Sequence, residues 1–140
     1  MTAVYYPDKQ LSLDESMILW RGRLAFRQYI KNKRHKYGIK LYMLTEPDGT
    51  ILQFRVYTGT HDAELAGTGH ASKVVMKLME GKLNQGHALY MDNYYNSCSL
   101  AETLLENDTY CTGTLRSSLK NNPKEVIKAK LKKGRKRIHV

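Results

Sequence analysis

Two aspartates occupy positions at which an α/β sheet gathers its functional groups. Asp14 lies in the stretch 10–18, where apolar and polar residues alternate as along a half-buried strand, and it falls on the polar side. Asp92 closes the apolar stretch 87–92, which is typical of a buried strand. Because the sites of open α/β sheets lie at the carboxyl ends of strands, pairing of these two strands would bring both carboxylates together.

A close pair of carboxylates is suited to binding a hard metal cation. Like charges repel at short range, and oxygen atoms are the ligands that Mg²⁺ and Mn²⁺ prefer. Two such ions held together activate an attacking oxygen and stabilise a leaving oxygen in phosphoryl transfer. The alternative is that Asp14 is a solvated strand residue and that Asp92 favours a turn at the end of its strand.

The elements around the two aspartates predict a mixed α/β sheet in the order β-β-β-α-β-α-β. Strands with short connections come first, and strands alternating with helices follow. Ser99 and Glu102 have the spacing of a capping box, and Trp20 is expected in the core, with stacking on a base as the alternative. The expected elements are strands at 10–18, 37–45 and 51–57, a helix at 70–83, a strand at 87–92, a helix at 98–107 and a strand at 109–115, followed by a basic helix at 123–132.

The charge of the 140-residue chain is unevenly distributed. The net charge is +10, and residues 21–40 carry eight basic and no acidic side chains. Residues 111–140 carry ten basic side chains and one acidic, whereas the segment between the two blocks is acidic. Such clustering indicates an anionic partner, with nucleic acid as the first candidate. No membrane partner is expected, because neither block has the apolar face of an interfacial helix.

The basic block 21–40 is the main candidate for contact with phosphates, because lysine and arginine release counterions from DNA. Phe26, Tyr29 and Tyr37 are interleaved with its basic residues. The alternative is a solvated connection between strands. The candidate DNA-binding residues, here and further along the chain, are Arg21, Arg23, Arg27, Lys31, Lys33, Arg34, Lys36, Lys40, Arg116 and Lys120.

Several segments, in order along the chain, resemble the piggyBac-type DDE transposases. The stretch 11–40 contains L-S-L-D-E, R-G-R, F-R-Q-Y and K-Y-G-I-K, as in the opening catalytic segment of that family. The segment 90–97, Y-M-D-N-Y-Y-N-S, is similar to the one that carries the second catalytic aspartate of the family. Shorter similarities are V-Y-T-G at 56–59, G-H-A-S-K-V-V-M-K-L at 69–78, G-T-L-R-S at 113–117 and N-P-K-E-V-I-K-A-K-L-K-K-G at 122–134.

The resemblance implies a ribonuclease H-like catalytic domain in which Asp14 and Asp92 are the first two catalytic, metal-binding aspartates. It implies Mg²⁺ or Mn²⁺ at a two-metal site, DNA as partner and, for the full-length family, a nuclear homodimer. The implied reaction is metal-dependent phosphodiester cleavage and strand transfer in DNA transposition. Residues 1–117 would form part of the core, and 118–140 a basic segment at the start of an inserted region or tail.

The third catalytic acid of that family has no match in this sequence, so the predicted core stops before the last catalytic element. Cys98 and Cys111, the two cysteines, are too few for the zinc-binding domain of the family and are typical of a reducing compartment. We therefore expect the chain by itself to be inactive or very weakly active. The alternatives are a non-catalytic DNA-binding module with the same fold and a basic RNA-binding domain, although the aromatic pattern of the common RNA-binding fold is missing.

Overall fold

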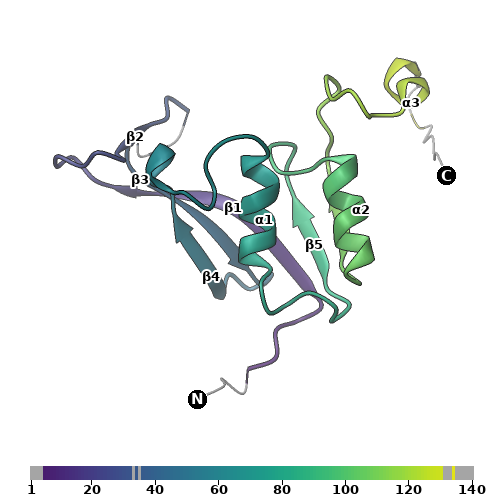
Figure 1. Ribbon diagram of the computed structural model, residues 1–140, viewed down its shortest axis with the longest axis horizontal. Helices are drawn as coiled ribbons and strands as arrows, with labels where there is room; N and C mark the ends of the chain where they lie inside the picture. Colours follow the sequence, from purple (N-terminus) through teal and green to yellow (C-terminus); the bar gives the residue numbers. More distant parts are fainter. Residues whose placement is uncertain (1–4, 33, 35, 131–133, 135–140) are drawn as a thin grey trace.

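The computed structural model describes residues 5–32, 34, 36–130 and 134, which form one mixed sheet with helices packed on one face (Figure 1). The strands are β1 (Gln10–Leu19), β2 (Gln28–Tyr29), β3 (Tyr37–Thr45), β4 (Ile51–Val56), β5 (Ala88–Met91) and β6 (Tyr110–Gly113). The helices are the 3-10 turn η1 (Gly59–His61), α1 (His70–Leu78), α2 (Cys98–Glu106) and α3 (Lys124–Lys128).

Strand β1 lies inside the sheet and joins its antiparallel and parallel parts. The strand order is β2-β3-β1-β5-β6, and β4 also pairs with β3. Strand β1 is antiparallel to β3 and parallel to β5, and β6 extends the parallel part beyond β5. The parallel register places Leu13 opposite Met91. The predicted mixed sheet is thus confirmed, and the two aspartate-bearing strands are neighbours in it.

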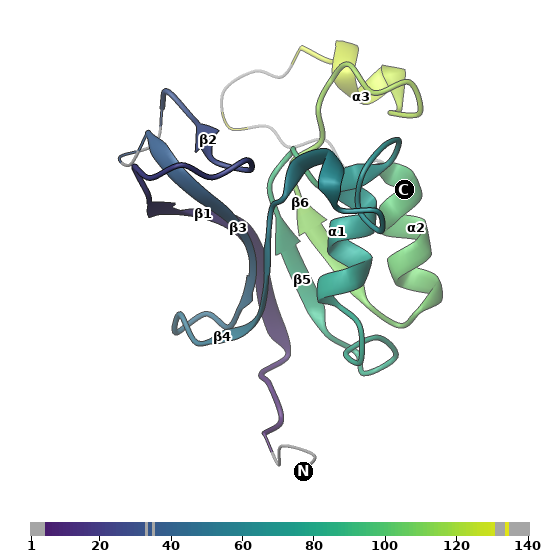
Figure 2. The ribbon, with the colours of Figure 1, turned by 60° about the vertical axis from the view of Figure 1, so that its left-hand side comes forward.

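The hydrophobic core lies between the sheet and helices α1 and α2, which cover the same face (Figure 2). Alternation along the strands puts every second side chain on this face. Apolar residues that are three and four positions apart form a stripe along each helix, and these stripes complete the core. The buried core comprises Leu11, Leu13, Tyr42, Leu44, Leu65, Val74, Val75, Leu78, Met79, Leu89, Met91, Tyr95, Leu100 and Leu104.

Helix α1 ends at Leu78, five residues before the end that the apolar periodicity predicts. Gly81 has a φ of 78°, in the left-handed region that commonly follows a helix C-terminus. Met79 and Leu83 nevertheless pack on the core. The apolar pattern therefore placed Met79 and Leu83 correctly on the core, although the segment 79–83 is not helical.

Helix α2 is capped by Ser97, so the predicted capping box of Ser99 and Glu102 is wrong by two residues. The Oγ atom of Ser97 accepts a hydrogen bond from the Leu100 N–H at 3.2 Å. Ser97 has the extended backbone of an N-cap residue, whereas Ser99 already lies inside the helix.

The end of the β1–β3 pair that is formed by the C-terminus of β1 and the N-terminus of β3 extends beyond the helices (Figure 1). This explains two further differences between the sequence prediction and the structure. Trp20 is 44% exposed just after β1, so its predicted place in the core is wrong. The two-residue strand β2 pairs with the same end of β3 and is too short for a periodic signal. Helix α3 is also shorter than predicted, because the backbone is extended at Ala129; residues 131 and 132 of the predicted helix lie outside the described part.

The opposite face of the sheet presents aromatic side chains to solvent. Tyr90 lies opposite Ser12, and Phe54 lies opposite Met43, which in turn pairs with Asp14. Phe54 is 58% exposed and Tyr90 is 41% exposed. Asp14 therefore stands on the face of the sheet that α1 and α2 do not cover.

Within the described part of the chain, every helix is too short or too polar to cross a bilayer.

Two adjacent leucines of α2 test the position of the core. Replacing Leu104, which is fully buried, with alanine is expected to lower the free energy of unfolding by about 2–5 kcal/mol, because it removes packed methyl groups and leaves a cavity. Leu105→Ala is the matched control, since Leu105 is 60% exposed, and is expected to change stability by less than about 1 kcal/mol. Urea unfolding of both variants measures the difference; equal losses would contradict this placement of α2.

Candidate active site

The strand register brings Asp14 and Asp92 side by side. Leu13 and Met91 form the last residue pair between β1 and β5, and an aspartate directly follows each of them in the chain. Both carboxylates belong to exposed residues. The Oδ1 atom of Asp14 accepts from the Glu15 N–H at 2.8 Å, and Oδ1 of Asp92 accepts from the Tyr94 N–H at 2.8 Å. Each carboxylate therefore keeps oxygen lone pairs with which it can bind a cation.

Asn96 connects the turn after Asp92 to strand β6 and to the residue that follows this strand. The backbone N–H of Asn96 donates to the Asp92 carbonyl at 3.2 Å. Its side-chain amide donates to the Thr114 carbonyl at 3.3 Å and accepts from the Cys111 thiol at 3.2 Å. Burial raises the pKa of Cys111, so that the thiol keeps the proton that it donates.

Tyr95 fastens the same turn to β1. Its hydroxyl donates to the Glu15 carboxylate at 3.0 Å, directly beside Asp14, and the tyrosine is almost fully buried. Burial, followed by the charge of Glu15, raises the pKa of Tyr95 well above its ordinary value of 10.0. The two aspartate-bearing segments are thus joined by a side-chain hydrogen bond as well as by the sheet.

Lys40 lies among three tyrosine rings rather than in the open basic surface. Its Nζ atom is 4.9 Å from the ring centre of Tyr42, 5.2 Å from that of Tyr94 and 5.6 Å from that of Tyr57. These distances are those of cation–π contacts. Lys40 therefore connects β3 with the turn that follows Asp92.

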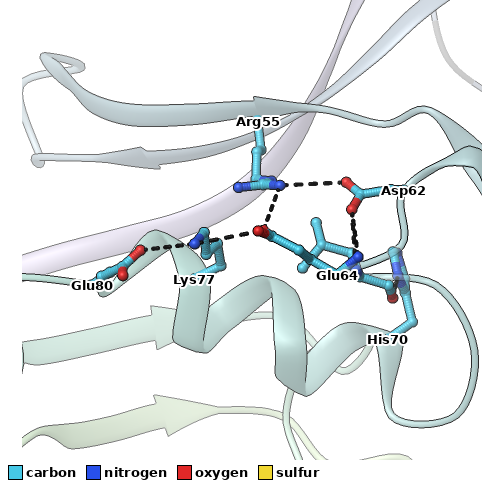
Figure 3. A network of polar contacts seen from close by, with 7 residues as sticks. Arg55, Asp62, Glu64, His70, Lys77 and Glu80 are labelled. Atoms are coloured by element: carbon cyan, nitrogen blue, oxygen red, sulfur yellow. Dashed lines mark hydrogen bonds and ion pairs between the residues drawn. The ribbon is translucent and has the colours of Figure 1, made fainter.

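A network of ion pairs fixes the connection between β4 and α1 (Figure 3). Arg55 of β4 lies 3.6 Å from Asp62 and 3.0 Å from Glu64. Lys77 of α1 lies 3.5 Å from Glu64 and 3.1 Å from Glu80. Most of these groups are partly exposed, so each pair contributes little stability by itself, and the network serves mainly to hold the connection against the helix.

His70, the first residue of α1, joins this connection to the sheet. Its Nδ1 atom lies 2.6 Å from the Leu65 carbonyl oxygen, which can only accept a hydrogen bond, so Nδ1 carries the proton. In the neutral ring Nε2 then accepts from the Tyr42 hydroxyl at 2.8 Å. The pKa of Tyr42 is raised above its ordinary value, mainly because its side chain is buried. This chain of hydrogen bonds holds Tyr42, one of the three tyrosines around Lys40, against the connection between β4 and α1.

Most of the predicted DNA-binding residues lie exposed on the projecting end of β1, β2 and β3. Arg27 donates to the carbonyls of Arg21 and Gly22 at 3.2 and 3.3 Å, and its guanidinium lies 5.4 Å from the Tyr37 ring centre. Tyr37 contacts Tyr29 with ring centres 4.8 Å apart, so basic and aromatic groups share one surface. Lys33 lies outside the described residues, whereas Arg21, Arg23, Arg27, Lys31, Arg34, Lys36 and Lys120 are exposed.

Arg116 is used within the protein. Its guanidinium donates to the carbonyls of Asn93 and Tyr94, in the turn after Asp92. The partners that hold Asp92 were therefore not predicted from the sequence. The Tyr94-Tyr95-Asn96 run directly after that aspartate was a local signal for them, but the segments that they contact could not be read from it.

The carboxylate pair fits a divalent cation as part of a ligand set. Two aspartates side by side supply hard oxygen ligands and repel each other without a counter-charge. Among the described residues no group of three or more histidine, cysteine or acidic side chains is placed to hold a metal ion. Asp14 and Asp92 are therefore two ligands of a site that needs further oxygen atoms for full coordination.

Alkaline titration tests the Tyr95–Glu15 hydrogen bond. The unfolded chain loses its tyrosine protons as pH rises through about 10, whereas folded Tyr95 keeps its proton, so the free energy of unfolding should fall in this range. Tyr95→Phe is expected to cost roughly 1.5–3 kcal/mol at pH 7 and to make the alkaline fall shallower. Denaturant unfolding between pH 7 and 11 measures both; Tyr110→Phe, at an exposed residue, is the control. An unchanged alkaline slope in Tyr95→Phe would contradict the bond.

Comparison with known proteins assigns the fold and the family. The family model described as Transposase IS4 matches residues 1–139. The structure is similar to that of piggyBac transposase in a synaptic complex with hairpin DNA, with a TM-score of 0.81 and 27% sequence identity. The match covers 91% of this chain and 27% of that chain, so the chain spans about a quarter of the length of the transposase that it resembles. This chain therefore belongs to the transposase IS4 family, and its ribonuclease H-like sheet is that of a piggyBac-like DDE transposase.

Proposed function

We propose that the chain is the part of a DNA transposase catalytic domain that supplies the first two metal-binding aspartates. The observation that carries this proposal is the parallel register of β1 and β5, which sets Asp14 beside Asp92 on the uncovered side of the sheet. The family and the fold support the same assignment. In this proposal both aspartates are catalytic as well as metal-binding.

Asp14 and Asp92 would hold Mg²⁺ or Mn²⁺ through their free carboxylate oxygens. A divalent cation bound there supplies charge that activates an attacking oxygen and stabilises a leaving oxygen at phosphorus. The protein itself holds the two carboxylates in place through the Tyr94 N–H and the Tyr95–Glu15 bond. Because a two-metal site needs more oxygen ligands than these, we propose that the chain alone cleaves DNA weakly or not at all.

The DNA would lie across the projecting basic surface next to the aspartates. The exposed basic residues there are of the type that contacts phosphates, and the exposed tyrosines offer faces for stacking. The similar piggyBac structure is a complex with hairpin DNA. Residues 118–140 are proposed as a second basic segment, in which Lys120 is exposed. A nuclear location and a homodimer are proposed from the same resemblance.

The second candidate is a DNA-binding module without catalytic activity. It is favoured by the exposed basic surface together with the two-aspartate site, which lacks a third acidic ligand among the described residues. The two candidates differ in whether the carboxylate pair binds a metal ion.

Metal binding tests the catalytic proposal. The chain is titrated with Mn²⁺, and the paramagnetic broadening of its NMR signals is measured. The signals of residues around Asp14 and Asp92 are expected to broaden first. Asp92→Asn should abolish this local broadening, because it removes a charged ligand. Asp108→Asn, at an exposed turn before β6, is the matched control and should leave it unchanged. Equal broadening in both variants would favour the non-catalytic module.

Salt dependence tests the DNA surface. The affinity for duplex or hairpin DNA is expected to fall linearly on a logarithmic plot against salt, with a slope of about −0.9 for each phosphate contacted. Each of Arg23→Gln and Lys36→Gln should make this slope shallower by about one. Lys82→Gln, after α1 on the helix-covered side, should not. Fluorescence anisotropy at several salt concentrations gives the slopes, and indistinguishable slopes in all three variants would contradict the proposed surface.

A further inference from the structure

We propose that Arg116 is a positioning residue for Asp92, acting through the turn 92–96 and not as a contact to DNA phosphate. This inference rests on the proposed function, because it gives Arg116 a role in the geometry of the carboxylate pair. Hydrogen bonds join the Arg116 guanidinium to the turn and, through Tyr94, to the Asp92 carboxylate.

The guanidinium of Arg116 holds two successive carbonyl groups of the turn. Its Nε donates to the Asn93 carbonyl at 2.9 Å, and one terminal nitrogen donates to the Tyr94 carbonyl at 3.3 Å. Its Cζ atom also lies 5.4 Å from the Tyr94 ring centre. The planar, forked donors of arginine suit this two-point grip, which a lysine ammonium cannot reproduce.

Tyr94 connects the hydrogen bonds of Arg116 with the Asp92 carboxylate. The residue whose carbonyl accepts from Arg116 is also the residue whose N–H donates to the Asp92 carboxylate at 2.8 Å. The Tyr94 ring lies within cation–π distance of two cations, Lys40 from β3 and Arg116 from the segment after β6. Tyr94 is thus held at its carbonyl and its ring, and its N–H is left pointing at the carboxylate.

Arg116 is itself fixed by the segment that follows β6. Its carbonyl accepts from the Asn122 side chain and from the Leu119 N–H at 3.2 Å, and Asn122 is buried. Gly113 brings this segment close, since a Cβ atom at that position would lie 2.1 Å from the Met91 carbonyl oxygen. The Arg116 backbone is therefore held by a buried asparagine, and the segment that carries it starts at a close contact with β5, although Arg116 itself is exposed.

The contacts between Arg116 and the turn 92–96 matter because the neighbouring carboxylates of Asp14 and Asp92 repel each other. Without a restraint, the exposed Asp92 turn would relax away from Asp14 and weaken any site that needs both. Residues that orient metal ligands through hydrogen bonds typically change metal affinity by about 10–100-fold when they are replaced. Arg116 is expected to act in this range, and Arg116→Lys should fail to restore what Arg116→Ala loses.

Two measurements separate positioning from phosphate contact. In Arg116→Ala the Mn²⁺ concentration for half-maximal broadening should rise about 10–100-fold, and the salt slope of DNA binding should stay unchanged. Arg23→Ala should give the reverse pattern. An unchanged Mn²⁺ response together with a slope shallower by about one would overturn the inference and make Arg116 a phosphate contact.

Hydrogen exchange of the Tyr94 amide tests the role of Arg116 without Mn²⁺. It therefore still gives an answer if Mn²⁺ fails to bind even the unaltered chain, a result that would reject the proposed metal site. The Tyr94 amide, which bonds to Asp92, should exchange its hydrogen faster in Arg116→Ala and Arg116→Lys. The Leu104 amide, in the packed core, reports global stability and should keep its exchange rate. If the Tyr94 amide exchanges at the same rate in all three proteins, Arg116 does not brace the turn.

Discussion

The parallel pairing of β1 with β5 is the constraint on which the rest of the site depends. The side-chain period of a strand is two residues, so a slip of one residue would turn Asp14 into the core and Leu13 out of it. Burial of Leu11 and Leu13 beneath the helices therefore fixes the register with hydrophobic free energy. The position of Asp14 beside Asp92 is a consequence of that burial.

The two aspartates and the hydrophobic core lie on opposite sides of the same sheet. Helices α1 and α2 bury one face, and this allows the other to hold polar and charged groups without loss of the core. The turn after Asp92 is the place where the two sides meet. Its Tyr95 points into the core and reaches Glu15, while Tyr94 and Asp92 remain at the surface.

Most of the architecture could be predicted from the sequence because it is carried by local patterns. Alternation located β1, β-branched and aromatic residues located β3 and β4, and the helical stripe of Val74, Val75 and Leu78 located α1. The errors have local causes as well. The apolar pattern of the helix continued into the turn at 79–83, and both Ser97 and Ser99 were possible N-cap residues. Trp20 was misplaced because its strand runs beyond the helices, which periodicity cannot reveal.

The sequence by itself determined the mixed sheet, the basic surface and the two aspartates at strand positions, because residue type and spacing along the chain encode these features. Tertiary structure alone decided which groups hold Asp92 in place. Arg116 and Lys40 meet at Tyr94 although they come from segments far apart in the chain, and both are basic residues that composition assigns to DNA. The physical reason is that a side chain's partner depends on the packing of distant segments, which the pattern of neighbouring residues does not record.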